Sequence, residues 1–407
     1  MTQLDADVIV VGAGPAGSLT ALLLARAGLH VLLLDRSSFP RAKACGDCLS
    51  AETGALLSRL DLLPLVTALP HARLDGWRIF APDGSHFAAS FRNVQALAVE
   101  RIHLDHALAR AAVAAGAVLH ENIRVLDLAA VDGVREVAAV RAGSSRGPVR
   151  LRSRFVVGAD GLRSVAARRL GAVARPAVTR KFSMTLHVDA ALPFDTQGEM
   201  HTGDGLCIGV APVSSPGDRW NVTVVADAAR FGRSAAVDQT AFVEHAVRSI
   251  PGTMRRIPSA ALHAAAPALA SGPFDVPTRR VTFPGAALAG DAAGYFDPFT
   301  GQGVYHALRA AELLAGEIEA ALGGGATLPV LNAYENGIRA LSRGSRRLQR
   351  LIDVVMTKPA LANRAVRRLA HSPLAAGVLL DVTGDITPVR RLLAPDVAFD
   401  LLRTRRS

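Results

Sequence analysis

The sequence predicts an α/β protein with three parts: a Rossmann-like domain with a parallel sheet that is discontinuous along the chain, an antiparallel β-sheet substrate domain, and a C-terminal helical segment. Two observations predict this architecture. Glycine- and aspartate-rich strand–turn–helix segments occur three times between residues 12 and 303, and strands of alternating hydrophobicity lie between them. The 407 residues, half of them hydrophobic, provide enough chain for two or three domains.

Residues 7–35 have the pattern of a complete βαβ unit. The β-branched run 7–11 is typical of a strand buried on both faces, residues 18–27 have a helical pattern, and a second buried strand over 30–34 ends at Asp35. Between the first strand and the helix lies the sequence Gly12-Ala13-Gly14-Pro15-Ala16-Gly17. The segment therefore predicts a dinucleotide-binding turn.

Each part of this turn has a physical task. Gly12 permits the turn, Gly14 lets the backbone approach a diphosphate, and Gly17 allows close helix packing. Free N–H groups and the positive end of the helix would then hold the phosphates. We expect Asp35 to accept hydrogen bonds from an adenosine ribose. Besides these glycines and Asp35, we predict that Pro15, Ala16 and Arg36 contact the cofactor.

Two later segments continue the pattern. Residues 155–164 (FVVGADGLRS) predict a strand, a polar turn and an arginine-rich helix, and residues 286–303 (AALAGDAAGYFDPFTGQG) predict a strand, a Gly-Asp turn and entry into a helix over 304–314. With all three segments in this order, the chain resembles the FAD-dependent oxidoreductases of the aromatic-hydroxylase fold. That superfamily includes monooxygenases, flavin halogenases and geranylgeranyl reductases.

The resemblance implies FAD as the cofactor and NAD(P)H as a transient reductant. It places the middle segment, with Asp160 and Gly161, near FAD and NAD(P)H, and the later Gly290 and Asp291 at the ribityl chain. An acid at the carboxyl edge of a strand can accept hydrogen bonds from such a polyol, and the following helix can direct its positive end at the flavin. The expected contacts of this last turn are Pro298, Gly301, Gln302 and Gly303.

A fourth stretch narrows the resemblance. Residues 39–50 (FPRAKACGDCLS) are similar to the P-R-x-K-x-C-G-D-G-L-S stretch of the geranylgeranyl reductase group, with Cys48 in place of a glycine. The similarity implies that Arg41, Cys45 and Gly46 lie near FAD, and Arg101 matches an arginine that this fold places against the cofactor.

Two absences bear on the reaction. The reductase group carries an aromatic strand beside the flavin, whereas residues 205–212 (GLCIGVAP) contain no aromatic residue. The W-x-W-x-I-P signature of flavin halogenases is also absent.

From these features we predict an FAD-dependent NAD(P)H oxidoreductase, a monooxygenase that hydroxylates or epoxidises a lipophilic or aromatic small molecule of secondary-metabolite type. The alternatives are a reductase that transfers hydride to C=C bonds, a flavin halogenase, and a non-catalytic FAD-binding protein that docks on membranes. Asp297 is the candidate catalytic residue because it lies in the Asp-Pro turn expected beside the ring, and His201 and Tyr295 are further candidates.

The net charge of +11 is almost wholly due to arginine. We interpret this excess as general compositional bias and predict no nucleic-acid partner, since aromatic residues make up only 5% of the chain. Arginines recur at helical spacing over 339–350, which predicts a basic amphipathic helix. Its basic face is either solvated or docks on an anionic membrane or an acyl-carrier protein. The oligomeric state stays open.

Cys45 and Cys48 form a C-x-x-C pair, but a single further cysteine cannot complete a metal site, so we predict no bound metal. The three cysteines and the lack of a signal peptide predict a cytoplasmic protein, with membrane contact only at the periphery. We expect the FAD-binding domain over 1–75, 99–175 and 276–335, the substrate-binding sheet over 76–98 and 176–275, and helices over 336–407.

Overall fold

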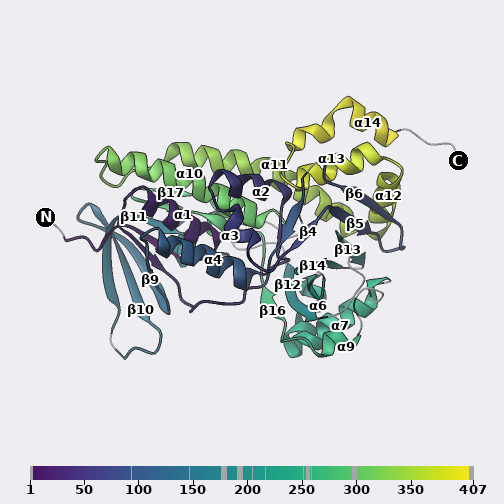
Figure 1. The fold of residues 1–407 in the computed structure, drawn as a ribbon, viewed down its shortest axis with the longest axis horizontal. Helices are drawn as coiled ribbons and strands as arrows, with labels where there is room; N and C mark the ends of the chain where they lie inside the picture. The colour runs from purple at the N-terminus through teal and green to yellow at the C-terminus, as the bar shows by residue number, and fades with distance from the viewer. Residues whose placement is uncertain are drawn as a thin grey trace.

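The structure of the chain, a computed structural model, describes residues 3–92, 94–145, 147–175, 181–189, 196–203, 205–215, 217–250, 252–253, 257, 259–295 and 300–402. The predicted fold class is confirmed. A Rossmann-like region with a parallel sheet, an antiparallel sheet and C-terminal helices are all present (Figure 1).

The larger sheet forms the Rossmann-like region. Its strands lie in the order β17-β18-β11-β1-β2-β8, and β10 and β9 continue it from β11. The strand β1 runs parallel to both β2 and β11, and β11 runs parallel to β18. The paired residues toward the carboxyl ends of these strands are buried and apolar, as is typical of a parallel sheet covered on both faces. The bounds are Ala6–Val11 (β1), Val31–Leu34 (β2), Val118–His120 (β8), Ile123–Val131 (β9), Val134–Arg141 (β10), Val149–Gly158 (β11), Thr282–Phe283 (β17) and Ala286–Leu288 (β18).

Helices α1 (Pro15–Arg26) and α4 (Arg101–Ala114) pack against strands of this sheet, and α1 also packs against α4 and α10 (Gly303–Gly323). The first of them begins inside the glycine motif, earlier than the sequence predicted, because Pro15 has the backbone angle of a first helical residue and needs no N–H partner there. The helix α10 continues past residue 314 over a run rich in alanine, leucine and glutamate, which favours helix. The short elements near this region are α5 (Val165–Arg169) and the 3-10 helix η1 (Gly290–Ala293).

A small three-stranded sheet lies beside the Rossmann-like region. Its order is β3-β7-β4, and β7 pairs antiparallel with both neighbours. Residues 96–98, assigned from the sequence to the substrate sheet, therefore pair with strands from the first 75 residues. The bounds are Cys48–Leu49 (β3), Ala72–Leu74 (β4), Ala96–Ala98 (β7), Ala51–Arg59 (α2) and Leu63–Thr67 (α3).

The second large sheet has seven strands in the order β16-β12-β15-β14-β13-β5-β6, and all its pairings are antiparallel except that of β5 with β13. The strands expected over 77–80, 182–188 and 220–226 are present within β5, β12 and β15. Helices α6, α7 and α9, which the sequence did not predict, pack on this sheet. The bounds are Gly76–Phe80 (β5), His86–Ser90 (β6), Lys181–Asp189 (β12), Gln197–Gly203 (β13), Leu206–Pro212 (β14), Arg219–Asp227 (β15), Leu269–Ser271 (β16), Ala228–Val237 (α6), Gln239–Ser249 (α7) and Ser259–His263 (α9).

The described residues from 332 to 402 are mainly helical, and their prolines mark helix boundaries. Pro359, Pro373 and Pro395 begin α12, α13 and α14, and Pro388 precedes the 3-10 helix η2. We expected these helices to pack outside the FAD domain, and α12 and α13 pack on β6 of the seven-stranded sheet. The bounds are Asn332–Met356 (α11), Pro359–Ala370 (α12), Pro373–Thr383 (α13), Val389–Leu393 (η2) and Pro395–Leu402 (α14).

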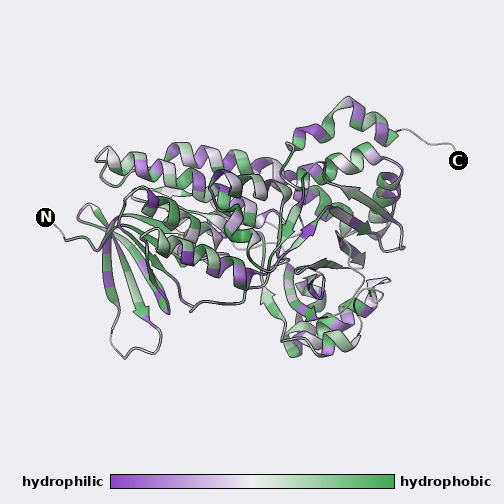
Figure 2. Ribbon diagram, in the orientation of Figure 1, coloured by the Kyte–Doolittle hydropathy of each residue, from purple (hydrophilic) through white to green (hydrophobic). Residues whose placement is uncertain are grey.

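Hydropathy follows this arrangement. The strands of the larger sheet are mainly hydrophobic, whereas the outer helices α10 and α11 alternate hydrophilic and hydrophobic residues along their length (Figure 2). Among the residues that the structure describes, no helix combines the length and apolar character needed to cross a bilayer.

Candidate functional site: a nucleotide cradle and an apolar cavity

The three glycine- and aspartate-rich turns meet at one edge of the parallel sheet. Val11, Gly158 and Leu288 are neighbours in register at the carboxyl ends of β1, β11 and β18. The turns that follow these three residues are the ones singled out in the sequence. Because carboxyl ends of parallel strands share one edge, segments distant in the chain form one cradle.

The glycines of the first turn are required by close packing. Gly12 has a φ of +99°, and a Cβ there would lie 2.5 Å from the carbonyl oxygen of Ala159. A Cβ on Gly17 would lie 1.8 Å from the carbonyl oxygen of Gly12. A side chain at Gly12 would therefore push the first turn away from the turn after β11, and one at Gly17 would push α1 away from Gly12.

Two helices begin at the cradle. The first turns of α1 and α10 contain no acidic residue, and neither helix has a side-chain cap at its N-terminus. Gly14, Ala16 and Gly303 line the space in front of them. Their free N–H groups and positive ends thus favour an anionic group at this position.

Two arginines complete this anion-binding site. The Nη2 atoms of Arg41 and Arg101 would lie 3.8 and 3.9 Å from a Cβ at Gly14. Asp105, which is fully buried, accepts from Arg101 Nε at 2.6 Å and lies 3.1 Å from Arg41 Nη1. Burial alone would lower the pKa of Arg101, but Asp105 and the neighbouring Cys45 outweigh it and the pKa is raised, so the guanidinium stays charged.

A second polar group faces the cavity at the third turn. Asp291 lies 4.0 Å from the ammonium nitrogen of Lys43, and Gly290, whose φ is +60°, packs against Ala16. Gly161 lies beside Lys43 in the same wall. Burial lowers the pKa of Lys43, and Arg101 lowers it further against the opposing effect of Asp291. This pair can hydrogen-bond to the hydroxyls of a polyol.

Three predicted contacts have other partners in the structure. Asp160 accepts from Ser164 Oγ at 2.5 Å and from two N–H groups at the start of α5, so it caps that helix. Asp35 accepts a hydrogen bond from the N–H of Ala13 at 2.8 Å, so part of the hydrogen-bonding capacity expected for a ribose is already used within the protein. Gln302 donates to Asp385 at 2.5 Å and ties the start of α10 to the loop after α13, outside the cavity wall.

The remaining candidates are dispersed. Asp297 and Pro298 lie outside the described residues. Arg36 is exposed. His201 is buried on the face of β13 opposite the cavity, where it bonds Glu199 and stacks on Phe80, and only its neighbour Met200 lines the cavity.

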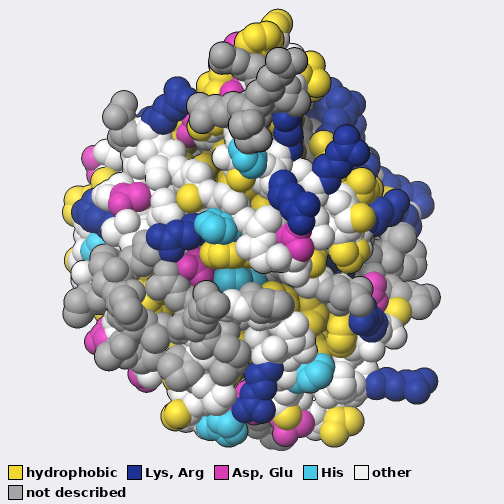
Figure 3. Space-filling view, turned by 90° about the vertical axis from the view of Figure 1, so that its right-hand side faces the viewer, with side chains coloured by type: hydrophobic (Ala, Val, Ile, Leu, Met, Phe, Trp, Pro, Cys, Tyr) yellow, Lys and Arg dark blue, Asp and Glu magenta, His cyan; other side chains and the backbone are white. Residues whose placement is uncertain are grey.

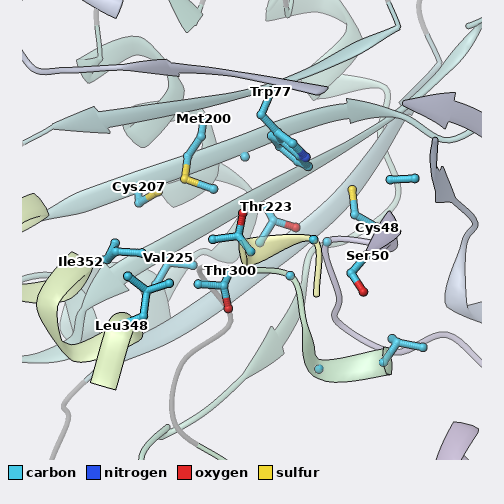
Figure 4. A pocket seen from close by; sticks show the side chains of 18 of the residues that line it. Cys48, Ser50, Trp77, Met200, Cys207, Thr223, Val225, Thr300, Leu348 and Ile352 are labelled. Atoms are coloured by element: carbon cyan, nitrogen blue, oxygen red, sulfur yellow. The ribbon is translucent and has the colours of Figure 1, made fainter. Parts of the chain in front are cut away.

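A cavity of about 650 Å³ extends from the cradle between the seven-stranded sheet and the C-terminal helices. In Figure 4, Trp77, Met200 and Cys207 lie on the strands, and Leu348 and Ile352 point toward them from α11. The wall on the side of α11 to α14 is mainly aliphatic, although Arg368 of α12 and Thr383 of α13 also line it. Its members there include Leu348, Leu351, Ile352, Val355, Met356, Val366, Leu369, Leu379, Leu380, Leu392, Leu393, Val397 and Leu401.

A polar network that the sequence analysis missed meets the cavity at Asp47. This residue is 1% exposed, and its carboxylate contacts His187 Nε2 at 2.6 Å and accepts from Asn221 at 2.7 Å. The other ring nitrogen of His187 lies 3.7 Å from Glu100, which accepts from Arg219 at 2.5 Å. Of these residues, only Asp47 belongs to a sequence motif, the stretch over residues 39–50.

The cysteines of the C-x-x-C pair are free thiols. Burial raises the pKa of both Cys45 and Cys48, which disfavours the nucleophilic thiolate. Within the described part of the chain, no group of three or more His, Cys, Asp or Glu side chains is placed to hold a metal ion.

Comparisons with known proteins place this geometry in a family. Residues 5–347 match the family model described as FAD binding domain. The chain belongs to this FAD binding domain family. It is 30% identical over 401 residues to the digeranylgeranylglycerophospholipid reductase of Methanothrix thermoacetophila, a match that covers 95% of this chain and 96% of the relative. The resemblance stated from the motifs is confirmed.

Solved structures share the fold. A flavin-dependent brominase, Bmp2, superposes with a TM-score of 0.78 at 18% identity and with 97% of each chain covered. The anhydrotetracycline hydroxylase OxyS from Streptomyces rimosus superposes with a TM-score of 0.72 at 23% identity, covering 93% of this chain and 76% of that one.

The cradle fits the cofactor of an FAD binding domain protein. The diphosphate would lie between the N-terminus of α1 and the two arginines, and the ribityl chain beside Asp291. FAD bound there would face the cavity, because Gly14, Gly290 and Gly301 line both. The family assignment thus makes the chain an FAD-binding oxidoreductase.

Proposed function

We propose that the chain is an FAD-dependent reductase that saturates carbon–carbon double bonds in a long, apolar substrate of isoprenoid type. The observation that carries this proposal is the cavity, whose aliphatic wall continues from the cradle along α11 to α14. A wall of this length and composition favours a flexible hydrocarbon chain. Similarity over nearly the whole chain to a lipid reductase supports the same class of reaction.

The sequence argument for a monooxygenase had two grounds: the missing aromatic residue in 205–212, and the Gly301-Gln302-Gly303 stretch that follows the Asp-Pro turn as it does in many hydroxylases. The structure supplies an aromatic side chain from a different strand, because Trp77 of β5 lines the cavity close to Met200 and Thr223 (Figure 4). The absence from β14 therefore does not separate the two reactions. Oxygen insertion becomes the competing outcome of the test below.

Reduced FAD, when bound, supplies the hydride, and NAD(P)H is the reductant that we propose for it. The protein holds the chain of the substrate in the apolar cavity, which excludes water from the reacting carbons. Lys43 and Asp291 orient the polar side of the cofactor, and the arginines of the cradle balance its negative charge.

Saturation of a double bond needs a proton as well as a hydride, since the product gains two hydrogen atoms. The proton reaches the cavity through His187 and Asp47, which are 2.6 Å apart. The His187 side chain is 16% exposed, so its imidazole can take up a proton from solvent, and Glu100, held by Arg219, lies 3.7 Å from its other ring nitrogen. Asp47 is thus resupplied with a proton after each turnover.

Product mass decides between the two reactions. FAD-loaded protein, reduced without oxygen and mixed with a polyprenyl lipid, is expected to yield a product heavier by two hydrogen atoms per double bond. Under an atmosphere of ¹⁸O₂ in place of air, the product is expected to carry no label. Product that forms only with oxygen and contains ¹⁸O would overturn the proposal in favour of a monooxygenase.

The proton path has its own test. His187→Gln keeps a hydrogen-bonding side chain but cannot carry a proton at neutral pH, so single-turnover product formation should fall about 100-fold. Flavin absorbance and substrate affinity should stay unchanged. His245→Gln, at an exposed position on α7, serves as the control. An unaltered rate and pH profile in His187→Gln would exclude this path.

A further inference from the structure

The positive charge of the protein is concentrated at one end of the chain. Residues 336–407 contain 14 arginines and lysines against 5 aspartates, whereas residues 1–335 contain 32 against 30 acidic residues. The C-terminal region thus carries +9 of the net +11. General compositional bias, as interpreted from the whole sequence, does not explain so uneven a distribution. A local excess of this size points to an anionic partner.

Exposed hydrophobic side chains occur in the same region. On α11, Leu351 is 61% exposed and Val354 is 50% exposed. Each follows an exposed arginine by four residues, Arg347 and Arg350 respectively, so cationic and apolar side chains share one helical face. The face begins one turn earlier, at the exposed Arg343.

The neighbouring elements add to this surface. Leu393 on η2 is 84% exposed, and Phe399 and Leu402 on α14 are 63% and 77% exposed. Figure 3 looks onto this end of the molecule, and lysine and arginine side chains gather there over the upper right, among hydrophobic ones. We name the set of Arg343, Arg347, Arg350, Leu351, Val354, Leu393, Phe399 and Leu402 the basic-apolar surface.

The cavity reaches this surface. Leu351 and Leu393 line the cavity and are nevertheless mostly exposed. The aliphatic wall therefore continues to the outside between α11 and η2, which contact each other. An apolar molecule could pass along these side chains to the cofactor cradle. Its entry is favoured where an apolar surface covers the mouth and excludes water from it.

We propose that the basic-apolar surface docks on the face of an anionic lipid bilayer, and that the apolar substrate moves from the bilayer into the cavity at this mouth. Arginines attract anionic headgroups while exposed leucine and phenylalanine side chains insert between acyl chains. A nucleic acid would use the arginines but leave the apolar side chains in water, and docking of an acidic carrier protein is an outcome of the test below. Docking stands independently of the reaction, whereas the transfer of substrate depends on the proposed function.

The docking step is tested with the full chain loaded with FAD and no substrate. Flotation with vesicles at roughly 0.1 M salt should show binding to phosphatidylcholine mixed with phosphatidylglycerol and little binding to phosphatidylcholine alone. Arg343→Glu combined with Arg347→Glu should weaken that binding at least ~10-fold. Neither residue lines the cavity.

Matched variants separate a specific surface from overall charge. Arg110→Glu with Arg124→Glu makes the same change in net charge at exposed positions of α4 and β9, and should leave vesicle binding unchanged. Phe399→Ser with Leu402→Ser should reduce binding without changing charge. Equal losses in the two arginine pairs, or retention by DNA or an acidic carrier protein without vesicle binding, would overturn the proposal.

The transfer step is measured separately. Wild-type protein should reduce a membrane-embedded polyprenyl lipid faster than the Arg343→Glu, Arg347→Glu variant does, while both should reduce a short, water-dispersed polyprenol equally. If the wild-type protein reduced neither substrate, the proposed function would be contradicted but docking would not. Equal rates on the embedded lipid would contradict transfer through this mouth.

Discussion

The cofactor cradle and the far wall of the cavity differ in how they are built. The cradle consists of backbone turns, helix N-termini and a buried group of ions around Asp105, which is fully buried. The far wall consists mainly of aliphatic side chains from four helices and one 3-10 helix. In the proposed function, polar geometry would fix FAD at one end of the site, and the apolar wall would hold the substrate at the other.

This difference has a consequence for the two halves of the site. A cradle built from fixed donors tolerates little substitution, because each donor has one position. A wall built from leucine, isoleucine and valine tolerates exchange among apolar side chains of similar volume. Substitutions in the cradle should therefore affect cofactor and stability together, whereas substitutions in the wall should affect substrate choice alone.

The largest effect is expected for Arg101→Met. The substitution leaves the fully buried Asp105 with Arg41 as its remaining cationic partner and should cost about 3 kcal/mol of unfolding free energy. Affinity for FAD should fall as well. Denaturant unfolding and flavin titration measure both. Arg110→Met, an exposed position on the same helix, is the control. Unchanged stability and FAD affinity would show that the buried ions do not hold the cradle.

A smaller and more selective effect is expected for Ile352→Trp. The larger side chain fills the cavity opposite the strands and should lower kcat/KM for a long polyprenyl substrate about 10-fold, while a short one reacts normally. Leu361→Trp, at a position outside the cavity wall, serves for comparison. Weakened FAD binding in Ile352→Trp would mean that the two halves are not separable.

The fold and the cradle were largely predictable because their signals are local. Gly12 and Gly290 adopt positive φ in their turns, and Gly17 lies where a Cβ would collide with the backbone of Gly12; each of these glycines is visible in a single stretch of sequence. Strands with alternating or continuous apolar patterns were placed correctly for the same reason. Proline at the start of α12, α13 and α14 likewise marks boundaries through its own backbone geometry.

The rest of the site depends on contacts between distant residues. Asp47 and His187 are 140 positions apart, and Asp47 and Asn221 are 174 apart, so no motif links them. Leu348 and Ile352 follow helical spacing, but that pattern is the same for a helix against a core and a helix against a cavity. Asp160 shows the converse, since a residue in a recognised motif turned out to cap a helix.

The smallest effect is expected from the Arg391–Asp396 pair, which joins η2 to α14. The hydrogen bonds from Arg391 lower the pKa of Asp396 to about 2. The folded-state pKa thus lies below the ordinary value, so the contribution of the pair is present at neutral pH and is lost as the pH falls toward 2. Asp396→Asn should remove it at all pH values. Hydrogen exchange should then rise slightly in α14 and stay constant in the cradle. Equal exchange in α14 of the wild type and of Asp396→Asn would show that the pair contributes nothing.

The dependence of substrate affinity on chain length tests the continuous apolar cavity most directly. Reduced, FAD-loaded protein is titrated without oxygen with saturated analogues of increasing length, and flavin absorbance reports binding. If the chain runs from the cradle along α11, each added methylene should contribute about 0.8 kcal/mol, roughly a fourfold gain in affinity, until the cavity is filled. Affinity that does not change with length would contradict the account.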